Sequence, residues 1–286
     1  LFGQYVPQEL VTEMSRRPGS YALGGESRQM TVLFSDLQDF TTLSETLEPH
    51  QLTRMMQFIL TPLTRIIHEQ RGTVDKYIGD AIMAFWGAPL PDPDHARHAV
   101  QAALAMKARL AELQPELLAH GWPALRIRIG INSGLMNVGN MGSQFRMAYT
   151  VLGDAVNLAA RLEGAAKQYG STIVISEFTR AAVPDLAGRE LDRARVKGRT
   201  QPVTLFEPLG PAAALSTSLR QELAEHEQAL IAYRARDWAQ AETRFQQLQT
   251  HHPEQPLYTL YLQRIAALRT DPPTAAWDGV FTFTEK

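Results

Sequence analysis

Two aspartates stand beside apolar runs that are typical of buried strands. Asp36 ends the run over residues 30–35, and Asp80 lies at the tip of an apolar hairpin over residues 76–85. A carboxylate at the end of a buried strand is costly unless a partner compensates for its lost hydration. Two such acids on neighbouring strands repel each other unless a cation lies between them. We therefore predict that Asp36 and Asp80 bind a divalent metal, and a metal beside phosphate-binding backbone indicates nucleotide chemistry.

The residues after Asp36 add a way to bind phosphate. A single acid at a strand end is most often a solvated residue or a helix cap, but two acids in apolar strands weaken that interpretation. If a turn or helix starts at Phe40 and Thr41, its free N–H groups point toward the metal and can hold phosphate without a lysine. We interpret Asp39 as a solvent-facing or capping acid rather than a third ligand.

Lys76 enters the same hairpin, and strand alternation places it on the face of Ile78 and Asp80. Its ammonium group is either a salt-bridge partner, the more common case, or a reader of a nucleotide base. An ammonium only donates hydrogen bonds. Adenine N1 accepts a hydrogen bond, whereas guanine N1 carries a hydrogen. A lysine that reads a base therefore favours adenine.

Further along the chain, Asn157 and Arg161 are four residues apart on one predicted helix and share a face. They form either an exposed polar stripe or a pair in which the arginine binds phosphate oxygens and the asparagine orients the ribose. Lys197 lies in a basic turn between two strands. It is either a surface residue or, if the loop folds over the site, a ligand of a terminal phosphate.

These side chains need a scaffold, and the sequence predicts one of alternating strands and helices. The core elements in order are a strand over 30–35, a helix over 50–70, strands over 73–78 and 81–86, a helix over 95–113 and a strand over 125–132. That order predicts an α+β fold, a ferredoxin-like βαββαβ sandwich, with both acids at one edge of one sheet. The remaining elements are strands over 147–152, 172–175, 189–196 and 203–207 and a helix over 154–168.

Local signals set the expected ends of these elements. Pro62 should kink or break the first long helix, and Gly72 should end it. Glycines at 134, 139 and 142 are expected to interrupt the chain after the strand over 125–132. Residue 154 is expected to be an N-cap or a first-turn acid of its helix.

Three segments make up the predicted domain organisation: residues 1–28 as an N-terminal helix and linker, 29–210 as a catalytic domain, and 211–286 as a helical extension. The N-terminal helix is predicted over Pro7–Met14. In the extension, helices are predicted over 230–236, 238–249 and 255–268. Trp238, Ala241, Phe245, Leu248 and Pro253 resemble the second helix of a tetratricopeptide unit. Solenoid repeats need about three copies, so we expect this segment to pack on something else.

The composition excludes several classes of protein. The chain has 286 residues, a net charge of −2 and no cysteine. Disulfides, thiolate zinc sites and cysteine nucleophiles are therefore excluded, and no strongly basic field indicates nucleic acid. No apolar run reaches the roughly 20 residues that span a bilayer, and no secretory signal is visible. Because the chain begins with Leu1, we expect it to be a piece of a longer protein.

Taken together, these residues closely resemble the catalytic domain of class III nucleotidyl cyclases over residues 28–208. The resemblance rests on several motifs in the right order, any one of which alone would be weak. The matching segments are Val32-Leu33-Phe34-Ser35-Asp36-Leu37-Gln38-Asp39-Phe40-Thr41, Lys76-Tyr77-Ile78-Gly79-Asp80-Ala81, Gly130-Ile131-Asn132-Ser133-Gly134 and Tyr149-Thr150-Val151-Leu152-Gly153-Asp154-Ala155-Val156-Asn157-Leu158-Ala159-Ala160-Arg161-Leu162.

The resemblance implies a role for each candidate residue. Asp36 and Asp80 would hold two divalent ions, Mg²⁺ or Mn²⁺. Lys76 and Thr150 would read adenine N1 and N6. Thr150 stands where many relatives carry aspartate, and its hydroxyl can still accept a hydrogen bond from N6.

The remaining roles concern the sugar and the phosphates. Asn157 and Arg161 would stabilise the transition state, and Lys197 would bind the triphosphate together with the backbone at Phe40 and Thr41. Leu135 replaces a basic residue that some relatives place there, so triphosphate binding is expected to depend more on Lys197.

The resemblance also implies an assembly and a setting. In this family the site lies between two subunits, with metal-binding acids from one and the base-reading and transition-state residues from the other. The chain carries both sets, so a homodimer with two complete sites is expected. Residues 2–7 and 277–280 resemble the cytosolic parts of bacterial receptor-type, CHASE2-like adenylate cyclases. A cytoplasmic location and a membrane-tethered parent protein follow as expectations.

The activity predicted from these features is adenylate cyclase, the conversion of ATP to 3′,5′-cyclic AMP and pyrophosphate. Three alternatives stay open. A guanylate cyclase is close in class, although Lys76 argues against it. A non-catalytic ATP-binding regulatory module is disfavoured because both acids, Asn157 and Arg161 are present. The third is a structural adaptor built on the C-terminal helices.

Overall fold

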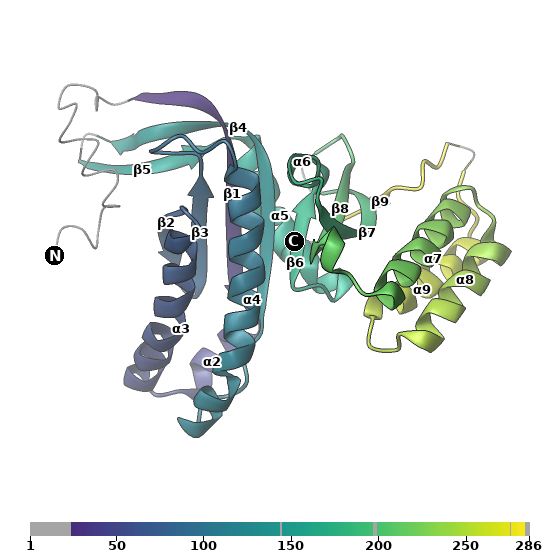
Figure 1. Cartoon of the computed structure of the whole chain (residues 1–286), viewed down its shortest axis with the longest axis horizontal. Helices are drawn as coiled ribbons and strands as arrows, with labels where there is room; N and C mark the ends of the chain where they lie inside the picture. Colours follow the sequence, from purple (N-terminus) through teal and green to yellow (C-terminus); the bar gives the residue numbers. More distant parts are fainter. Residues whose placement is uncertain (1–23, 144, 197–198, 275, 284–286) are drawn as a thin grey trace.

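The computed structural model describes residues 24–143, 145–196, 199–274 and 276–283, and within them one nine-stranded sheet runs through the molecule (Figure 1). The strand order is β2-β3-β1-β4-β6-β8-β7-β9, and β5 pairs with β4 alone. The strands are β1 (Gly24–Leu37), β2 (Thr73–Ile78), β3 (Ala81–Trp86), β4 (Ile127–Ser143), β5 (Arg146–Leu152), β6 (Ile173–Ser176), β7 (Leu186–Arg195), β8 (Val203–Pro211) and β9 (Phe281–Thr282).

The helices are α2 (Phe40–Thr46), α3 (Pro49–Glu69), α4 (His95–Ala119), α5 (Asp154–Tyr169), α6 (Glu177–Ala182), α7 (Thr217–Arg234), α8 (Trp238–His251) and α9 (Pro256–Thr270), with a 3-10 turn at Ala212–Ala214. The predicted α+β class is confirmed. The four strands β2-β3-β1-β4 pair antiparallel throughout. Among the described residues no helix is both long enough and apolar enough to cross a bilayer.

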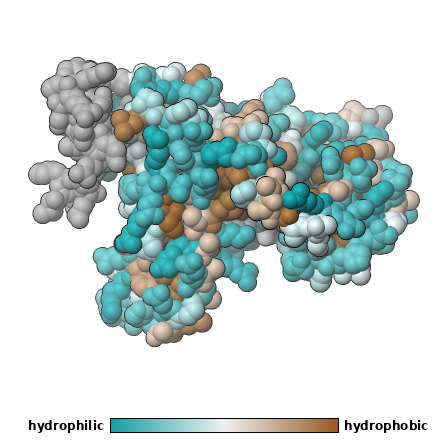
Figure 2. Space-filling view, in the orientation of Figure 1, coloured by the Kyte–Doolittle hydropathy of each residue, from teal (hydrophilic) through white to brown (hydrophobic). Residues whose placement is uncertain are grey.

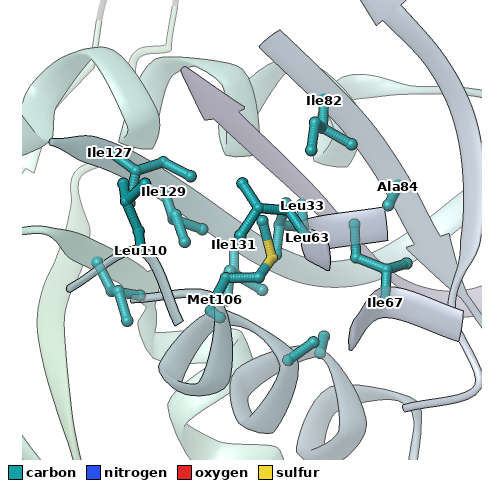
Figure 3. Packing of buried hydrophobic residues seen from close by; sticks show 14 of the residues in the cluster. Leu33, Leu63, Ile67, Ile82, Ala84, Met106, Leu110, Ile127, Ile129 and Ile131 are labelled. Carbon is teal, nitrogen blue, oxygen red and sulfur yellow. The ribbon is translucent and has the colours of Figure 1, made fainter. Parts of the chain in front are cut away.

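Strand alternation sends one set of side chains toward α3 and α4. Figure 3 shows this core: Leu33 from β1, Ile82 from β3 and Ile129 from β4 meet Leu63 of α3 and Met106 of α4. All five side chains are at most 1% exposed. Burial of this size fixes the register of β1, β3 and β4, because a slip of one residue would turn every side chain to the other face.

The opposite face of the sheet is covered by α5 and β5. A Cβ at Gly130 would lie 2.3 Å from the backbone oxygen of Ala159, so α5 packs directly on the β4 backbone there. Met83 and Val151 belong to the apolar cluster on this face. Phe34 is only partly buried, and Asp36 lies two residues further along β1 on the same face.

Several predicted boundaries were wrong, for identifiable reasons. No break occurs at Pro62, because α3 continues through it to Glu69. Gly72 is not the left-handed residue after α3: Arg71 has φ 64, and Gly72 is required because a Cβ there would lie 2.6 Å from the Trp86 ring. Likewise α4 runs past residue 113 to Ala119, although Pro115 lies inside it.

The first and fourth strands are longer than predicted. β1 begins at Gly24, so residues 24–28 belong to the sheet rather than to a linker, and Asp36 lies inside the strand. β4 continues to Ser143 through the three glycines that were expected to interrupt it. Gly142 is needed where β4 meets β5, because a Cβ there would lie 2.2 Å from the oxygen of Arg146. Asp154 is a first-turn acid of α5, and Gly153 is its N-cap. The helix predicted over Pro7–Met14 lies outside the described residues.

The C-terminal helices α7, α8 and α9 pack on the end of the sheet and on α5 (Figure 1). Tyr169 of α5 shares an apolar cluster with Phe245 of α8 and Tyr261 of α9. The outward surface of these helices is mainly hydrophilic (Figure 2). The resemblance to a tetratricopeptide unit stays a prediction, as does a division of the chain at residue 210. The strand β9, which pairs with β7, was not predicted.

Candidate active site

The two predicted metal ligands, Asp36 and Asp80, come together at one edge of the sheet. Asp36 is the second-last residue of β1, and Asp80 sits in the turn between β2 and β3, after Gly79 with φ 65. The Asp80 Oδ2 atom accepts a hydrogen bond from the Leu37 backbone N–H at 3.0 Å. Partial burial, a hydrogen bond with Asp36 and the negative charge of Asp36 raise the pKa of Asp80 to about 6. The two acids therefore repel each other, which is the situation that a bound cation would relieve.

Arg128, which the sequence analysis did not single out, is the protein cation next to this pair. It lies opposite Asp36 in the β1–β4 register, and its Nη2 is 3.1 Å from Asp36 Oδ2. Its Nε donates to Glu163 Oε1 of α5 at 2.9 Å. Because Arg128 divides its charge between two acids, it does not neutralise Asp80 as well. The signal for it was a charged residue in the alternating apolar strand Ile127–Ile131.

A divalent cation fits this site. Within the described residues no group of three or more histidine, aspartate or glutamate side chains is arranged as a metal cage. Mg²⁺ does not require one, since it keeps several waters and is bound by one or two carboxylates together with substrate phosphates. The neighbouring carboxylates of Asp36 and Asp80 supply that number of hard oxygen ligands. Asp39 is exposed and its side chain caps no helix, so it faces solvent as expected.

Lys76 and Thr150, the predicted base readers, also lie together, and a residue that sequence reasoning missed connects them. Asp75 accepts a hydrogen bond from the Thr150 hydroxyl through Oδ2, across 75 positions of sequence. Its Oδ1 lies 3.3 Å from the Lys76 ammonium. That distance suits an ion pair, but Oδ1 has no hydrogen-bond partner in the described part of the chain. The Asp75 side chain is 1% exposed and that of Lys76 is 45% exposed.

A β-bulge makes this contact possible. The pairing of β2 with β3 shifts between Val74 and Lys76, so Asp75 is the extra residue. Bulges re-aim side chains and are frequent beside active sites. Here Lys76 stays opposite Met83 on the face that carries Asp36, while Asp75 turns to Thr150. The only sequence signal was an acid beside the lysine within a strand.

The other candidate residues take separate positions. Asn157 is exposed on α5, and Arg161 is half-buried one turn later. The Nη1 atom of Arg161 is buried without a hydrogen-bond partner among the described residues. Among the described residues, no hydrogen bond or ion pair joins Asn157 or Arg161 to Asp36 or Asp80.

The phosphate-binding candidates are less completely placed. The helix α2 begins at Phe40, which packs partly against the core, and Thr41 is exposed. The first hydrogen bond of α2 runs from the Leu43 N–H to the Asp39 carbonyl oxygen at 3.1 Å. The backbone N–H groups before Leu43 therefore have no partner within the helix itself. Lys197 lies outside the described residues.

Comparison with known proteins identifies the family of the chain. Residues 25–206 match the family model of the adenylate and guanylate cyclase catalytic domain. Adenylate cyclase 1 of Rhizobium meliloti (strain 1021) is 35% identical over 221 residues, which cover 76% of this chain and 33% of that protein. The chain thus spans about a third of that relative.

Two solved structures are similar to the chain. The adenylyl cyclase CyaB from P. aeruginosa has a TM-score of 0.62 at 35% identity, covering 68% of this chain and 100% of that chain. The guanylyl cyclase Cya2 has a TM-score of 0.61 at 32% identity, covering 68% of this chain and 98% of that chain. One of these structures is named as an adenylyl cyclase and the other as a guanylyl cyclase, so the likeness does not distinguish adenine from guanine as the base of the substrate. The family is nevertheless established: this chain belongs to the adenylate and guanylate cyclase catalytic domains.

Proposed function

We propose that the chain is an adenylate cyclase that converts ATP to 3′,5′-cyclic AMP and pyrophosphate. The reaction would be an in-line attack of the ribose 3′-oxygen on the α-phosphorus. The observation that carries this proposal is the contact between Asp36 and Asp80 at the hairpin tip, where burial and like charge raise the pKa of Asp80 to about 6. A site of this kind, in a chain of the cyclase family, is suited to divalent cations and a nucleoside triphosphate.

In this proposal the carboxylates of Asp36 and Asp80 hold two divalent cations. When bound there, the cations supply positive charge that acidifies the 3′-hydroxyl and offsets the charge of the triphosphate. Arg128 keeps the Asp36 side chain in place through its contact at 3.1 Å. The chain itself does no covalent chemistry, and its contribution is positioning and charge stabilisation.

Arg161 and Asn157 complete the reacting geometry from α5. The buried Nη1 of Arg161 has a hydrogen to donate and no acceptor among the described residues, which supports a role in binding phosphate oxygens. Asn157 is exposed and four residues earlier, where it can orient the ribose. The backbone at Phe40 and Thr41, together with Lys197, would bind the phosphates.

Adenine preference is proposed from Lys76 and Thr150. The Lys76 ammonium donates to adenine N1, and guanine N1 carries a hydrogen that would oppose it. The Thr150 hydroxyl accepts from the N6 amino group. The guanylyl cyclase Cya2 has a similar fold, so the alternative is a guanylate cyclase, and the preference for adenine is the property to test first.

A homodimer is proposed as the active form. Several large apolar side chains on β2, β4 and β5 are more than half exposed, which is the surface expected of an unpaired interface. They are Ile78 at 55%, Leu135 at 60%, Met147 at 55% and Leu152 at 56%. In this proposal, association through these strands would bring the acids of one chain to the α5 residues of its partner.

The setting and the organisation of the chain are also proposals. We place the ferredoxin-like catalytic domain at residues 29–210, supported by the antiparallel order β2-β3-β1-β4, and a helical, tetratricopeptide-like segment at 211–286. The parent protein would be tethered to a membrane with this part in the cytoplasm.

The test is a cyclic-nucleotide assay on the purified chain with ATP or GTP and either Mg²⁺ or Mn²⁺. We expect cyclic AMP from ATP, and a specific activity that falls as the chain is diluted through its dimer dissociation constant. Cyclic GMP as the main product would show a guanylate cyclase. Constant specific activity far below that dissociation constant would contradict the shared site.

A further inference from the structure

Asp75 occupies an unusual position between the two base-reading candidates. Its side chain is 1% exposed, yet it carries a carboxylate, and the bulge in β2 aims that group at Thr150 of β5. Rings of Phe85 and Tyr149, 6.2 Å apart, pack β5 against β3 beside it. A buried carboxylate is retained only where its hydrogen bonds compensate for its lost hydration.

The chemistry of this contact fixes the direction of the hydrogen bond. An ionised carboxylate can only accept, so the hydrogen between Asp75 and Thr150 belongs to the Thr150 hydroxyl. A threonine hydroxyl has one hydrogen and two lone pairs. With its one hydrogen committed to Asp75, Thr150 can offer only lone pairs to a nucleotide base.

That restriction discriminates between the purines. The adenine 6-amino group donates a hydrogen bond and meets a lone pair of Thr150, whereas guanine O6 accepts and would meet an acceptor. Without Asp75, the hydroxyl could rotate and donate to O6. We propose that Asp75 is a specificity-determining residue that makes Thr150 an obligate acceptor and so selects adenine.

Lys76 receives the second effect of the same carboxylate. Asp75 Oδ1, 3.3 Å from the ammonium, holds this partly exposed side chain near Thr150. The Oδ1 atom is itself buried, so the base does not reach it. Asp75 is therefore a positioning residue that acts through Thr150 and Lys76. This inference rests on the proposed binding of a purine nucleotide at that pair.

The decisive substitution is Asp75→Asn, which keeps the shape and reverses the polarity. Beside the Lys76 ammonium, the amide oxygen of asparagine faces the lysine and its NH₂ group faces Thr150. The Thr150 hydroxyl then accepts from the amide and is free to donate to guanine O6. The wild-type site would have to leave polar groups unpaired to accept guanine, and such a site rejects the wrong ligand strongly. Asp75→Asn removes that restriction, so we expect the preference for ATP over GTP to fall about tenfold or more.

Binding and turnover are measured separately. Calorimetry with 3′-deoxy-ATP and 3′-deoxy-GTP in Mg²⁺ gives the binding preference without cyclisation, and product assays give kcat/KM for ATP and GTP. Asp92→Asn is the matched control, because Asp92 is another buried acid, 4% exposed, paired with His98. Asp75→Glu, which keeps an acceptor-only group, should retain more of the adenine preference than Asp75→Asn.

The outcomes separate the two proposals. If Asp75→Asn abolishes the selective binding of 3′-deoxy-ATP, the inference is supported even when the chain forms no cyclic AMP. The absence of cyclic AMP would contradict the proposed function alone. In a Thr150→Val background, Asp75→Asn should no longer change the binding preference. An unchanged preference in Asp75→Asn, an equal loss of both nucleotides, or a wild type without preference would each overturn the role of Asp75.

Discussion

Two regions of this molecule place carboxylates within the fold, and the surroundings of these carboxylates differ. At the junction with the C-terminal helices, the side chain of Asp192 is 2% exposed. It accepts from Arg264 Nη1 at 2.6 Å and from the Tyr169 hydroxyl at 2.9 Å. At the hairpin tip, by contrast, Asp80 faces another acid, and the nearest arginine is shared between Asp36 and Glu163.

A second acid at the junction shows the same completeness. Glu222 accepts from Arg189 Nη2 at 2.6 Å and from the Tyr258 hydroxyl at 2.5 Å. Arg189 also donates to Glu207 at 2.9 Å. Acids with a full set of donors serve structure, whereas acids that are left short of positive charge indicate a site for a charged ligand. Compensation as well as burial separates the two regions, because the Asp36 side chain is 31% exposed.

The largest expected effect comes from neutralising either acid at the hairpin tip. Asp36→Asn or Asp80→Asn should lower metal-dependent turnover by about 10³-fold or more, because the charge of the bound cations is worth several kcal/mol in the transition state. The free energy of unfolding of Asp80→Asn should not fall, since this change removes a repulsion, whereas Asp36→Asn also weakens the contact with Arg128. Product assays and thermal unfolding measure the two quantities.

The exposed neighbour Asp39 supplies the matched control for these variants. Asp39→Asn removes the same charge three residues from Asp36 and should leave turnover unchanged. Full activity in Asp36→Asn or in Asp80→Asn would remove the two-metal mechanism.

The junction should show the reverse pattern, with loss of stability as the primary effect. Arg264→Met leaves the carboxylate of Asp192 buried without its cation, and breaking a buried pair in this way costs about 3–5 kcal/mol. Arg269→Met is the control, because Arg269 forms an ion pair with Glu242 at 53% and 34% exposure. An exposed pair of that kind contributes at most about 1 kcal/mol.

Denaturant unfolding of both variants measures the difference, and Asp192→Asn added to Arg264→Met should recover part of the loss. Equal effects of Arg264→Met and Arg269→Met would show that the buried pair is not required for stability.

The same contrast explains what the sequence could predict. Asp36 and Asp80 were identifiable because each ends an apolar run, a pattern contained in a few neighbouring residues. The contact of Asp75 with Thr150 was not, since it joins positions 75 residues apart and depends on a bulge that has no clear local signature. Arg128 was overlooked because its partners come from β1 and α5.

Helix boundaries failed where polar residues are buried. The helix predicted over 230–236 begins at Thr217 in the structure. Glu222 and His226, four residues apart, occupy the buried face of α7, so the segment lacks the apolar periodicity on which the prediction depended. Their partners lie on other elements, and only the folded chain shows that these polar groups are satisfied.

Acid should weaken the junction through His226. Its ring is 2% exposed, and Nε2 lies 2.6 Å from the Glu190 backbone oxygen, so the neutral ring donates there. Burial lowers the pKa of His226 to about 4 despite that hydrogen bond, and the charges of Arg189 and Arg234 add to the effect. The unfolded chain takes up the proton near pH 6.5. This contribution to stability is therefore complete above pH 6.5 and is lost as the pH falls toward 4.

The loss attributable to His226 is at most about 3 kcal/mol. Unfolding free energies at pH 7, 6 and 5 should converge between the wild type and His226→Gln as the pH falls, because glutamine does not titrate. His50→Gln, a change at an exposed histidine, is the control and should run parallel to the wild type. Parallel curves for His226→Gln would show that the buried ring does not govern the pH dependence.

The smallest effect expected is a change in metal affinity with pH, and its sign is set by Asp80. Because the pKa of Asp80 in the folded chain is about 6, above its ordinary value, the stability that its proton provides is present below about pH 4 and is lost as the pH rises through 6. A cation needs the ionised carboxylate, so proton and metal compete, and Mg²⁺ affinity should fall about fivefold from pH 6 to pH 5.

Calorimetric titration of Mg²⁺ at pH 5, 6 and 7 measures this competition, and Mg²⁺ binding at pH 6 should release about half a proton per site. Affinity that does not change over this range would show that Asp80 is already ionised and that the hairpin tip is as fully compensated as the junction. A falling affinity would instead mean that the proton fills, in the free chain, the electrostatic role that the cation fills in the working site. Acid would then stabilise the hairpin tip, which lacks positive charge. It would weaken the C-terminal junction, where the buried ring of His226 is neutral and would have to take up a proton.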